Sequence, residues 1–271
     1  MTELPRIFDR ALHRRRLDRA ARRFGGADFL VGRAAVDLAA RLRMVNRAFP
    51  IAVEMGARQG VLRRVLEGER ARVGLLVETA LSEVMLRRTG GIRVVADEER
   101  LPLAPQAVDL IVSALSLHWI NDLVGCLIQV RRALRPDGLF IGSLLGGATL
   151  TELRQVLLEA EIEILGGAGP RVSPFADAYD CAALLQRAGF ALPVVDVDTV
   201  RVRYDHPLKL LADLRAMGET SVLVQRPAAL SREVLRRACE FYLRRFSGAD
   251  GRITATFEIL ALTGWAPRPG Q

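Results

Sequence analysis

The sequence predicts an α/β protein with an open, mostly parallel sheet, antiparallel last strands and helices on both faces. Short apolar runs alternate with helical patterns between about residues 48 and 145, which is typical of successive β-α-β units. Half of the 271 residues are hydrophobic, enough for the core of one large domain with an insertion. Beyond residue 147, strands with alternating polarity indicate antiparallel pairing at one side of the sheet.

Five strands are expected in the first half of the chain, each a short apolar run bounded by turn-forming or acidic residues. Their ranges are 50–55, 73–77, 92–96, 108–114 and 139–144. Helices are expected at 61–67, 81–88 and 123–134, and Pro136–Gly138 is expected to form a turn.

The second half is predicted to mix helices with edge strands. Helices are expected at 151–165 and 176–188, strands at 192–196, 199–204 and 254–263, and a mostly helical stretch at 207–246. We therefore expect an N-terminal helical arm or lid (1–47), an α/β domain (48–206 and 248–271) and a helical insertion on the substrate or partner side (207–247).

Basic charge is concentrated near the start of the chain. The net charge of +8 comes from 39 Lys+Arg against 31 Asp+Glu, and Lys209 is the only lysine. The early cluster is Arg6, Arg10, Arg14, Arg15, Arg16, Arg19, Arg22 and Arg23. No aromatic residue interleaves with the arginines from Arg10 to Arg23, so we expect a solvated helix face rather than stable DNA binding. A transit peptide and an RNA-binding arm are the alternatives.

The same segment also carries apolar residues that would let a lid helix pack on the body. They are Ile7, Phe8, Leu12, Ala20, Ala21 and Phe24. The longest apolar stretches elsewhere, at 108–120 and 139–150, are interrupted and too short for a transmembrane segment, and no secretory signal pattern opens the chain. Three separated cysteines and three separated histidines show no disulfide or metal-ligand spacing, so no metal site is expected.

Acidic residues fall at the predicted ends of three strands. Glu54 lies on the first strand, Glu78 ends the second and Asp97 follows the third. Ligands of open parallel sheets bind outside the carboxyl ends of the strands. A carboxylate after the second strand can accept the ribose hydroxyls of an adenosine, and one after the third can accept its adenine amino group. Acidic residues are common at strand ends simply because these ends are exposed to solvent. Acids at the ends of three successive strands are better explained by an adenosine-binding site.

Four segments in the middle of the chain carry a specific resemblance. They are ADEERLPL (96–103), VDLIVS (108–113), LSLHWINDL (115–123) and LRPDG (134–138). Together they resemble the class I S-adenosylmethionine-dependent methyltransferases. The His118-Trp119 segment resembles one branch, which contains the malonyl-carrier-protein methyltransferase of biotin synthesis and the methyltransferase-fold assembly factor of respiratory complex I.

Further segments resemble the complex I factor from near residue 7 to near residue 266. They are IFDR (7–10), GGATLTELR (146–154), SPF (173–175), RAGF (187–190), MGE (217–219) and GW (264–265). The resemblance implies a Rossmann-like methyltransferase sheet and S-adenosylmethionine as the cofactor.

The resemblance also implies roles for individual residues. Gly56 and Gly60 match the glycine loop beside the methionine part of the cofactor, and Glu54 precedes that loop. Glu78 matches the acid that binds the ribose. The remaining cofactor-binding candidates are Asp97 and Glu98 for adenine, and Ser113, Ala114 and Leu115 beside the sulfonium. On the substrate side, the candidates are Trp119, Arg154, Ser173 and Phe175.

His118 is the candidate catalytic residue. As a general base it must reach a proton of the acceptor and titrate near neutrality. A hydrogen-bonded pocket wall is the alternative role. Trp119 beside it is expected to fill the core rather than to stack on substrate.

The chain departs from the family at Ala57-Arg58, where a small residue followed by glycine is usual. Glycine serves such loops because it adopts positive φ and has no Cβ to hold a ligand away. Arg58 could therefore strain the turn, swing outward or enter the cofactor space. The last outcome makes cofactor binding the weakest part of the resemblance, and it predicts that Arg58→Gly tightens that binding.

The function that we expect is that of an S-adenosylmethionine-dependent methyltransferase-like protein acting on a protein client in complex I assembly. The alternatives are an arginine hydroxylase of a complex I subunit, a non-catalytic assembly factor with a degenerate cofactor loop and, less favoured, an RNA methyltransferase. The expected location is the cytoplasm, or the mitochondrial matrix in a eukaryote, with peripheral contact to the inner membrane left open.

Overall fold

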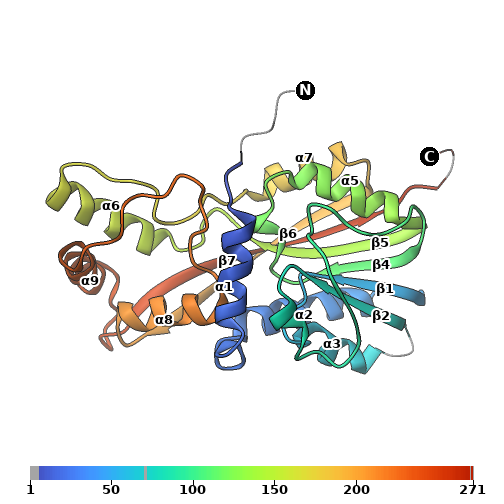
Figure 1. Ribbon diagram of the computed structural model, residues 1–271, viewed down its shortest axis with the longest axis horizontal. Coiled ribbons are helices and arrows are strands. Elements are labelled where there is room, and N and C mark those ends of the chain that lie inside the picture. Colours follow the sequence, from blue (N-terminus) through green and yellow to red (C-terminus); the bar gives the residue numbers. More distant parts are fainter. Residues whose placement is uncertain (1–5, 70–71, 269, 271) are drawn as a thin grey trace.

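The computed structural model describes residues 6–69, 72–268 and 270, and a seven-stranded sheet runs through its centre (Figure 1). The strand order is β3-β2-β1-β4-β5-β7-β6. The strands are β1 (Phe49–Met55), β2 (Val73–Ala80), β3 (Ile92–Val95), β4 (Val108–Ser113), β5 (Leu134–Leu145), β6 (Ala191–Tyr204) and β7 (Ile253–Trp265). The first five strands pair in parallel, and β7 pairs antiparallel with both β5 and β6. The predicted fold class is confirmed.

Helices cover both faces of the sheet, and the central strand β4 is buried along its whole length as a result. The helices are α1 (Arg10–Ala20), α2 (Phe29–Arg43), α3 (Val61–Leu66), α4 (Glu83–Leu86), α5 (Leu123–Ala133), α6 (Thr151–Leu165), α7 (Ala178–Arg187), α8 (Pro207–Met217) and α9 (Arg232–Phe246). Leu38 of α2 and Leu62 of α3 belong to one hydrophobic core. Cys126 of α5 and Leu185 of α7 belong to a second core, so the two helix pairs lie on opposite faces (Figure 1).

Two local expectations from the sequence are wrong. The strands expected at 192–196 and 199–204 form the single strand β6, which pairs with β7 along almost its whole length. Polar residues are tolerated in its middle because β6 is an edge strand whose Asp196 and Asp198 pair with Arg41 and Arg33 of α2. The expected turn at 136–138 lies inside β5, where Asp137 has a φ of +59° and the pairing with β4 shifts register.

A two-stranded ribbon extends past the carboxyl end of β5. The strand β5 ends at Leu145, which pairs with Ile259, so among the named strands β7 residues 253–258 pair with β6 and not with β5. Helices α6, α8 and α9 pack on this extension and contribute to the same core as α2 (Figure 1). We call this extension with its three helices the ribbon lobe. It flanks the edge of the sheet at which ligands of parallel α/β proteins bind.

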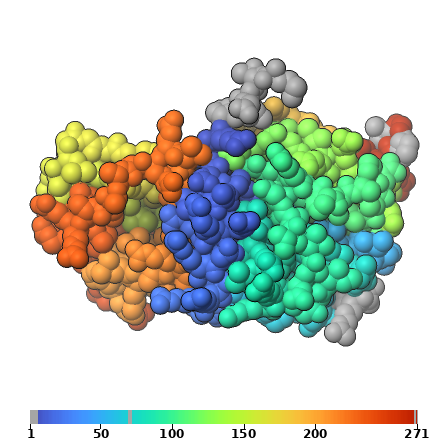
Figure 2. All heavy atoms as spheres, in the orientation of Figure 1, coloured from blue at the N-terminus to red at the C-terminus, as the bar shows by residue number. Residues whose placement is uncertain are grey.

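The helix α1 lies in the seam between the ribbon lobe and the rest of the sheet (Figure 2). Leu17 of α1 and Phe24 after it are buried in the hydrophobic core that includes α2. The Asp9 side chain caps α1 by accepting from the Leu12 N–H, and the Asp9 N–H donates to the Val222 carbonyl. No helix in the described ranges is long and apolar enough to cross a membrane.

Candidate functional site

Glu54 and Glu78 face each other across neighbouring strands near the carboxyl edge of the sheet. They are register partners on β1 and β2, and both are buried, with 2% and 0% exposure. The Arg63 Nε donates to Glu78 Oε2 at 2.7 Å, whereas Glu78 Oε1 has no hydrogen-bond partner among the described residues. Burial and the neighbouring Glu78 raise the pKa of Glu54 to about 8. Glu54 therefore carries a proton at neutral pH, while Glu78 presents an oxygen with unused acceptor capacity.

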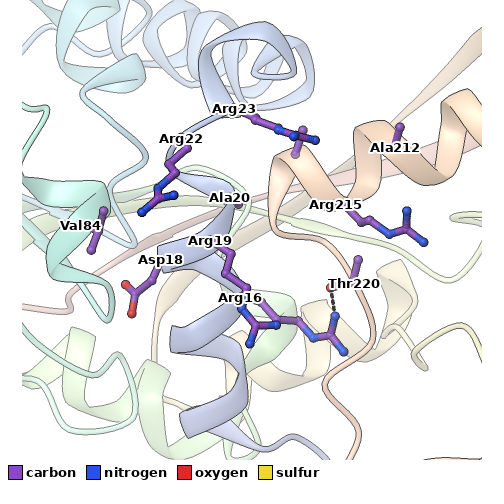
Figure 3. A pocket seen from close by; sticks show the side chains of 11 residues that line it. Arg16, Asp18, Arg19, Ala20, Arg22, Arg23, Val84, Ala212, Arg215 and Thr220 are labelled. Carbon is purple, nitrogen blue, oxygen red and sulfur yellow. Dashed lines mark hydrogen bonds between the residues drawn. The ribbon is translucent and has the colours of Figure 1, made fainter. Parts of the chain in front are cut away.

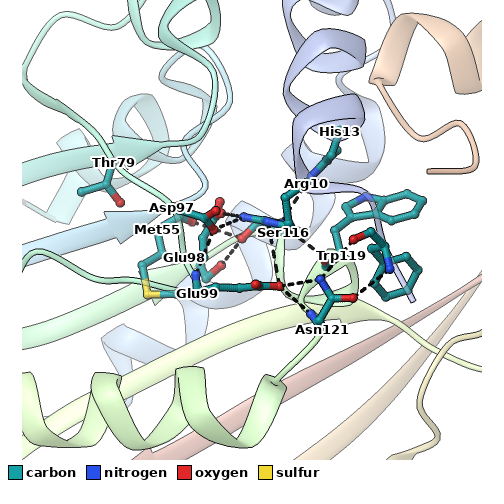
Figure 4. Close-up of polar contacts among 12 residues, drawn as sticks. Arg10, His13, Met55, Thr79, Asp97, Glu98, Glu99, Ser116, Trp119 and Asn121 are labelled. Atoms are coloured by element: carbon teal, nitrogen blue, oxygen red, sulfur yellow. Dashed lines mark hydrogen bonds and ion pairs between the residues drawn. The ribbon is translucent and has the colours of Figure 1, made fainter. Parts of the chain in front are cut away.

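The acids after β3 are held by an arginine from α1 (Figure 4). Arg10 Nη2 is 2.6 Å from Asp97 Oδ1 and also pairs with Glu98, and Arg10 Nη1 donates to the Trp119 carbonyl at 3.2 Å. Burial opposes the charge of Arg10, but Glu98 and Asp97 outweigh it and raise the pKa of the guanidinium. The Arg10 side chain thus connects α1 to the predicted adenine-binding acids.

Asn121 fixes the residues that precede α1. Its Oδ1 accepts from the backbone N–H groups of Ile7 and Phe8, both at 2.8 Å, and its Nδ2 donates to Glu99 Oε1 (Figure 4). The start of the described chain is therefore fixed in two ways, through backbone hydrogen bonds to Asn121 and through the ion pairs of the Arg10 side chain.

The glycine loop after β1 packs tightly against the segment after β4. Gly56 has a φ of +71°, and a Cβ built there would lie 2.2 Å from Ser116 Cβ and 3.2 Å from Glu98 Oε1. Only glycine fits this approach. The loop therefore brings Gly56, Glu98 and Ser116 together, and Ser116 Oγ lies 2.8 Å from Ser113 Oγ. Gly60, at a φ of +69°, begins α3 farther along the loop.

Arg58 does not swing outward to solvent. Its side chain is buried at 3% exposure, and its Nη2 lies 3.4 Å from Glu219 Oε1. Its Nη1 has no partner in the part of the chain that the structure describes. Burial, with Arg58 and Arg10 nearby, holds the pKa of His13 well below its usual value, so this histidine of α1 is neutral.

Glu219 is the centre of a second polar cluster. Its Oε2 accepts from His118 Nε2 at 2.8 Å and from Trp119 Nε1 at 2.9 Å. Burial opposes ionisation, but His118, Arg58 and the Trp119 N–H outweigh it, and the pKa of Glu219 is lowered. The Leu145 N–H donates to His118 Nδ1 at 3.4 Å, so both ring nitrogens are engaged. This geometry suits His118 as a support for Glu219 better than as a general base.

A pocket of about 310 Å³ opens beside Glu219, between the sheet edge and the ribbon lobe. Its walls are mainly apolar and include Leu145, Leu150, Leu153, Leu157, Phe175, Leu211, Leu214 and Leu230. Its polar lining includes Glu219, Ser173 and Thr220, with Arg16, Arg171 and Arg215 at its sides. The pocket thus combines an apolar wall with a carboxylate.

The predicted site residues divide between two places. Ser113 at the end of β4 and Ala114 and Leu115 directly after it are buried, close to the glycine loop. Trp119, Ser173 and Phe175 line the pocket, and Trp119 also packs in a core cluster with Phe8 and Leu12. Arg154 instead donates to the carbonyls of Gly147 and Ser173, at 3.5 and 3.4 Å, and so supports the pocket wall.

Three further residues of the site were not chosen from the sequence: Arg10, Arg63 and Glu219. Arg10 and Glu219 lie in the segments IFDR and MGE, so the resemblance contained a signal for both. Arg63 carries no such signal, because an arginine on a helix is usually solvated. No group of three or more His, Cys, Asp or Glu residues within the described ranges could hold a metal ion.

Comparison with known proteins places the chain among methyltransferase folds. A family model described as "Methyltransferase domain" matches residues 53–142. The chain is 38% identical to "Arginine-hydroxylase NDUFAF5, mitochondrial" of Homo sapiens over 272 residues, 98% of this chain and 78% of that protein. It is 30% identical to the "Malonyl-[acyl-carrier protein] O-methyltransferase" of a Methylovorus species, over 99% of this chain and 93% of that protein.

Solved structures agree on the fold. The YcgJ protein of Bacillus subtilis superposes with a TM-score of 0.59 at 13% identity, covering 86% of this chain and 98% of that one. A putative methyltransferase from Haloferax volcanii, solved with its Trm112 activator, gives 0.54 at 17% identity, covering 95% and 99%. At these identities the likeness concerns the fold alone.

Proposed function

The chain belongs to the methyltransferase-fold family that includes the arginine-hydroxylase NDUFAF5, and from this premise we propose that it is an enzyme that binds S-adenosylmethionine and modifies an arginine side chain of a protein client. The observation that carries the proposal is Glu219, an ionised carboxylate at the side of an apolar pocket. A carboxylate beside aromatic and aliphatic walls is the environment that favours a guanidinium group.

The chemistry of the buried acids supports binding of the cofactor. Among the residues that the structure describes, none donates to Glu78 Oε1, and a ribose hydroxyl would supply a donor. None of them accepts from Arg58 Nη1 either, and the carboxylate of the methionine part would supply an acceptor. The adenine amino group would use Asp97 or Glu98, which Arg10 occupies in this structure, so Arg10 must share or release them. When bound, S-adenosylmethionine supplies an electrophilic methyl group.

The client arginine would enter the pocket beside Glu219. Phe175 and Trp119 offer aromatic surface for a guanidinium plane, and Glu219 offers charge. His118 and Trp119 hold the carboxylate in place by donating to Oε2, which leaves Oε1 to the weaker contact with Arg58. Arg58 thus lies between the proposed cofactor and client sites.

For the client we propose a protein of respiratory complex I. The support is the resemblance of almost the whole chain to the complex I assembly factor, together with the relatives described as mitochondrial. In a eukaryote the location that follows is the mitochondrial matrix, and in a bacterium the cytoplasm.

Isothermal titration with S-adenosylmethionine tests cofactor binding. We expect binding to the wild type and at least tenfold weaker binding to Glu78→Gln, because a charged hydrogen-bond acceptor for ribose contributes about 1.5–3 kcal/mol. Glu83→Gln, on the exposed side of α4, is the matched control and should bind like the wild type. Mass spectrometry of an arginine-containing client peptide then separates methylation from hydroxylation by the mass of the added group. Equal affinity of the Glu78 and Glu83 variants would contradict the assigned cofactor site.

A non-catalytic assembly factor is the second candidate, and one observation favours it. Arg63 forms an ion pair with Glu78, and Arg10 forms ion pairs with Asp97 and Glu98. Arginines of the chain itself thus neutralise the acids that we expect to bind the cofactor. The same titration decides between the two candidates. Absence of heat with the folded wild type at high micromolar ligand supports the assembly factor.

A further inference from the structure

A wide groove of about 830 Å³ lies along α1, with Val84 of α4 on one side and Ala212 and Arg215 of α8 on the other (Figure 3). Five arginines line it: Arg16, Arg19, Arg22, Arg23 and Arg215. They come from α1, from the turn after it and from α8. We call this feature the arginine groove.

The arginines of the groove lack carboxylate partners. Within residues 6–69, 72–268 and 270, none of the five forms an ion pair, although Arg33, Arg237 and many other arginines do. The one acidic residue that lines the groove, Asp18, accepts a hydrogen bond from Ser82. Burial and the repulsion from Arg226, Arg19 and Arg215 lower the pKa of Arg16. Five arginines without an ion-pair partner among the described residues therefore share this groove with one carboxylate.

The arginine groove adjoins the pocket of the proposed client site. Arg16, Arg215 and Thr220 line both, and Glu219 precedes Thr220 in the chain. Arg16 Nη1 donates to Thr220 Oγ1 at 2.7 Å and so marks the boundary between them (Figure 3). A bound chain segment could thus follow the groove and place one side chain beside Glu219.

From this arrangement we infer that the arginine groove binds an acidic segment of the client protein next to the residue that enters the pocket. The inference rests on the proposed function and adds the chemistry of the client sequence: carboxylates flanking an arginine. Charge complementarity supports it, since carboxylates pair with arginines in forked geometry. No aromatic side chain lines the groove to stack on bases, which disfavours RNA, and its concave shape disfavours a membrane surface.

Fluorescence anisotropy with a labelled peptide tests the inference. The probe is a synthetic peptide with one arginine followed by several glutamates, and no cofactor is added. We expect Arg19→Gln/Arg22→Gln to weaken binding about tenfold, because two exposed ion pairs contribute up to about 1 kcal/mol each. Added salt should weaken binding to the wild type.

A matched control separates the groove from net charge. Arg187→Gln/Arg201→Gln removes two exposed arginines of α7 and β6, which do not line the groove, and should change the affinity by less than about twofold. Equal weakening by both double variants would overturn the inference. So would tighter binding of a uridine oligonucleotide or of phosphatidylserine vesicles than of the peptide in competition. Because the assay contains no cofactor, its failure leaves the titration with S-adenosylmethionine, and the proposal that it tests, untouched.

Discussion

The proposed cofactor half and the proposed client half of the site use their carboxylates differently. In the cofactor half, Glu78 pairs with Arg63 on the neighbouring helix and leaves one oxygen without a partner. In the client half, Glu219 uses both oxygens and joins residues of two other segments, Arg58 of the glycine loop and the adjacent His118 and Trp119 after β4. We therefore expect the proposed cofactor acids to act mainly in binding, whereas Glu219 also connects the ribbon lobe to the rest of the sheet.

The largest effect that follows is on stability at Glu219. Glu219→Ala leaves Arg58, His118 and the Trp119 N–H buried without their partner, and we expect a loss of about 3–5 kcal/mol in the free energy of unfolding. Urea denaturation measures it. Glu78→Ala removes one partner of a single ion pair, and the partly exposed Arg63 that it leaves can reach solvent, so this variant should cost less. Equal destabilisation of the two variants would contradict the claim that Glu219 contributes more to stability than Glu78.

A pH dependence follows from Glu54. Its folded pKa of about 8 lies above the usual 4.5, so the folded protein keeps a proton that the unfolded chain releases. Stability should therefore fall as the pH rises from about 4.5 toward 8, by at most about 1.4 kcal/mol per pH unit. Denaturation at several pH values should show this slope in the wild type and a flatter curve in Glu54→Gln. An identical slope in both would contradict the assignment.

Arg10 connects the lid helix to the cofactor half, so Arg10→Ala should act on both stability and binding. We expect a loss of about 1.5–3 kcal/mol in unfolding free energy, from charged hydrogen bonds, and tighter binding of S-adenosylmethionine to the released Asp97 and Glu98. Thermal denaturation and calorimetry measure the two effects. Arg14→Ala, an exposed residue of the same helix, is the control and should change neither.

The smallest effect concerns Arg58, for which the sequence and the structure favour opposite outcomes. An obstructing arginine predicts that Arg58→Gly tightens cofactor binding. The partnerless Nη1 of the buried side chain favours a donor to the cofactor carboxylate, and we therefore expect binding weaker by up to about tenfold. Calorimetry decides by the sign of the change. The affinity of Arg58→Lys, which keeps the positive charge, should lie between those of the wild type and Arg58→Gly.

The sequence predicts the sheet well because its strands are local apolar runs between turn-forming residues. It also predicts Glu54 and Glu78 near each other, since parallel strands bring their carboxyl ends to one edge. It misses the partners of the acids. Arg10 meets Glu98 across 88 positions, and His118 meets Glu219 across 101, and no local pattern encodes such pairs. The length of β6 was also missed, because charged residues interrupt its alternation on an exposed edge.

The position of α1 implies that the two ligands influence each other. Arg10 and Arg16 are less than two helical turns apart, and they reach the cofactor acids and the arginine groove respectively. A molecule that shifts this helix at one end changes the affinity at the other, and thermodynamic linkage makes that influence equal in both directions. Cooperativity between binding of the cofactor and binding of the client would thus be transmitted by the single helix α1.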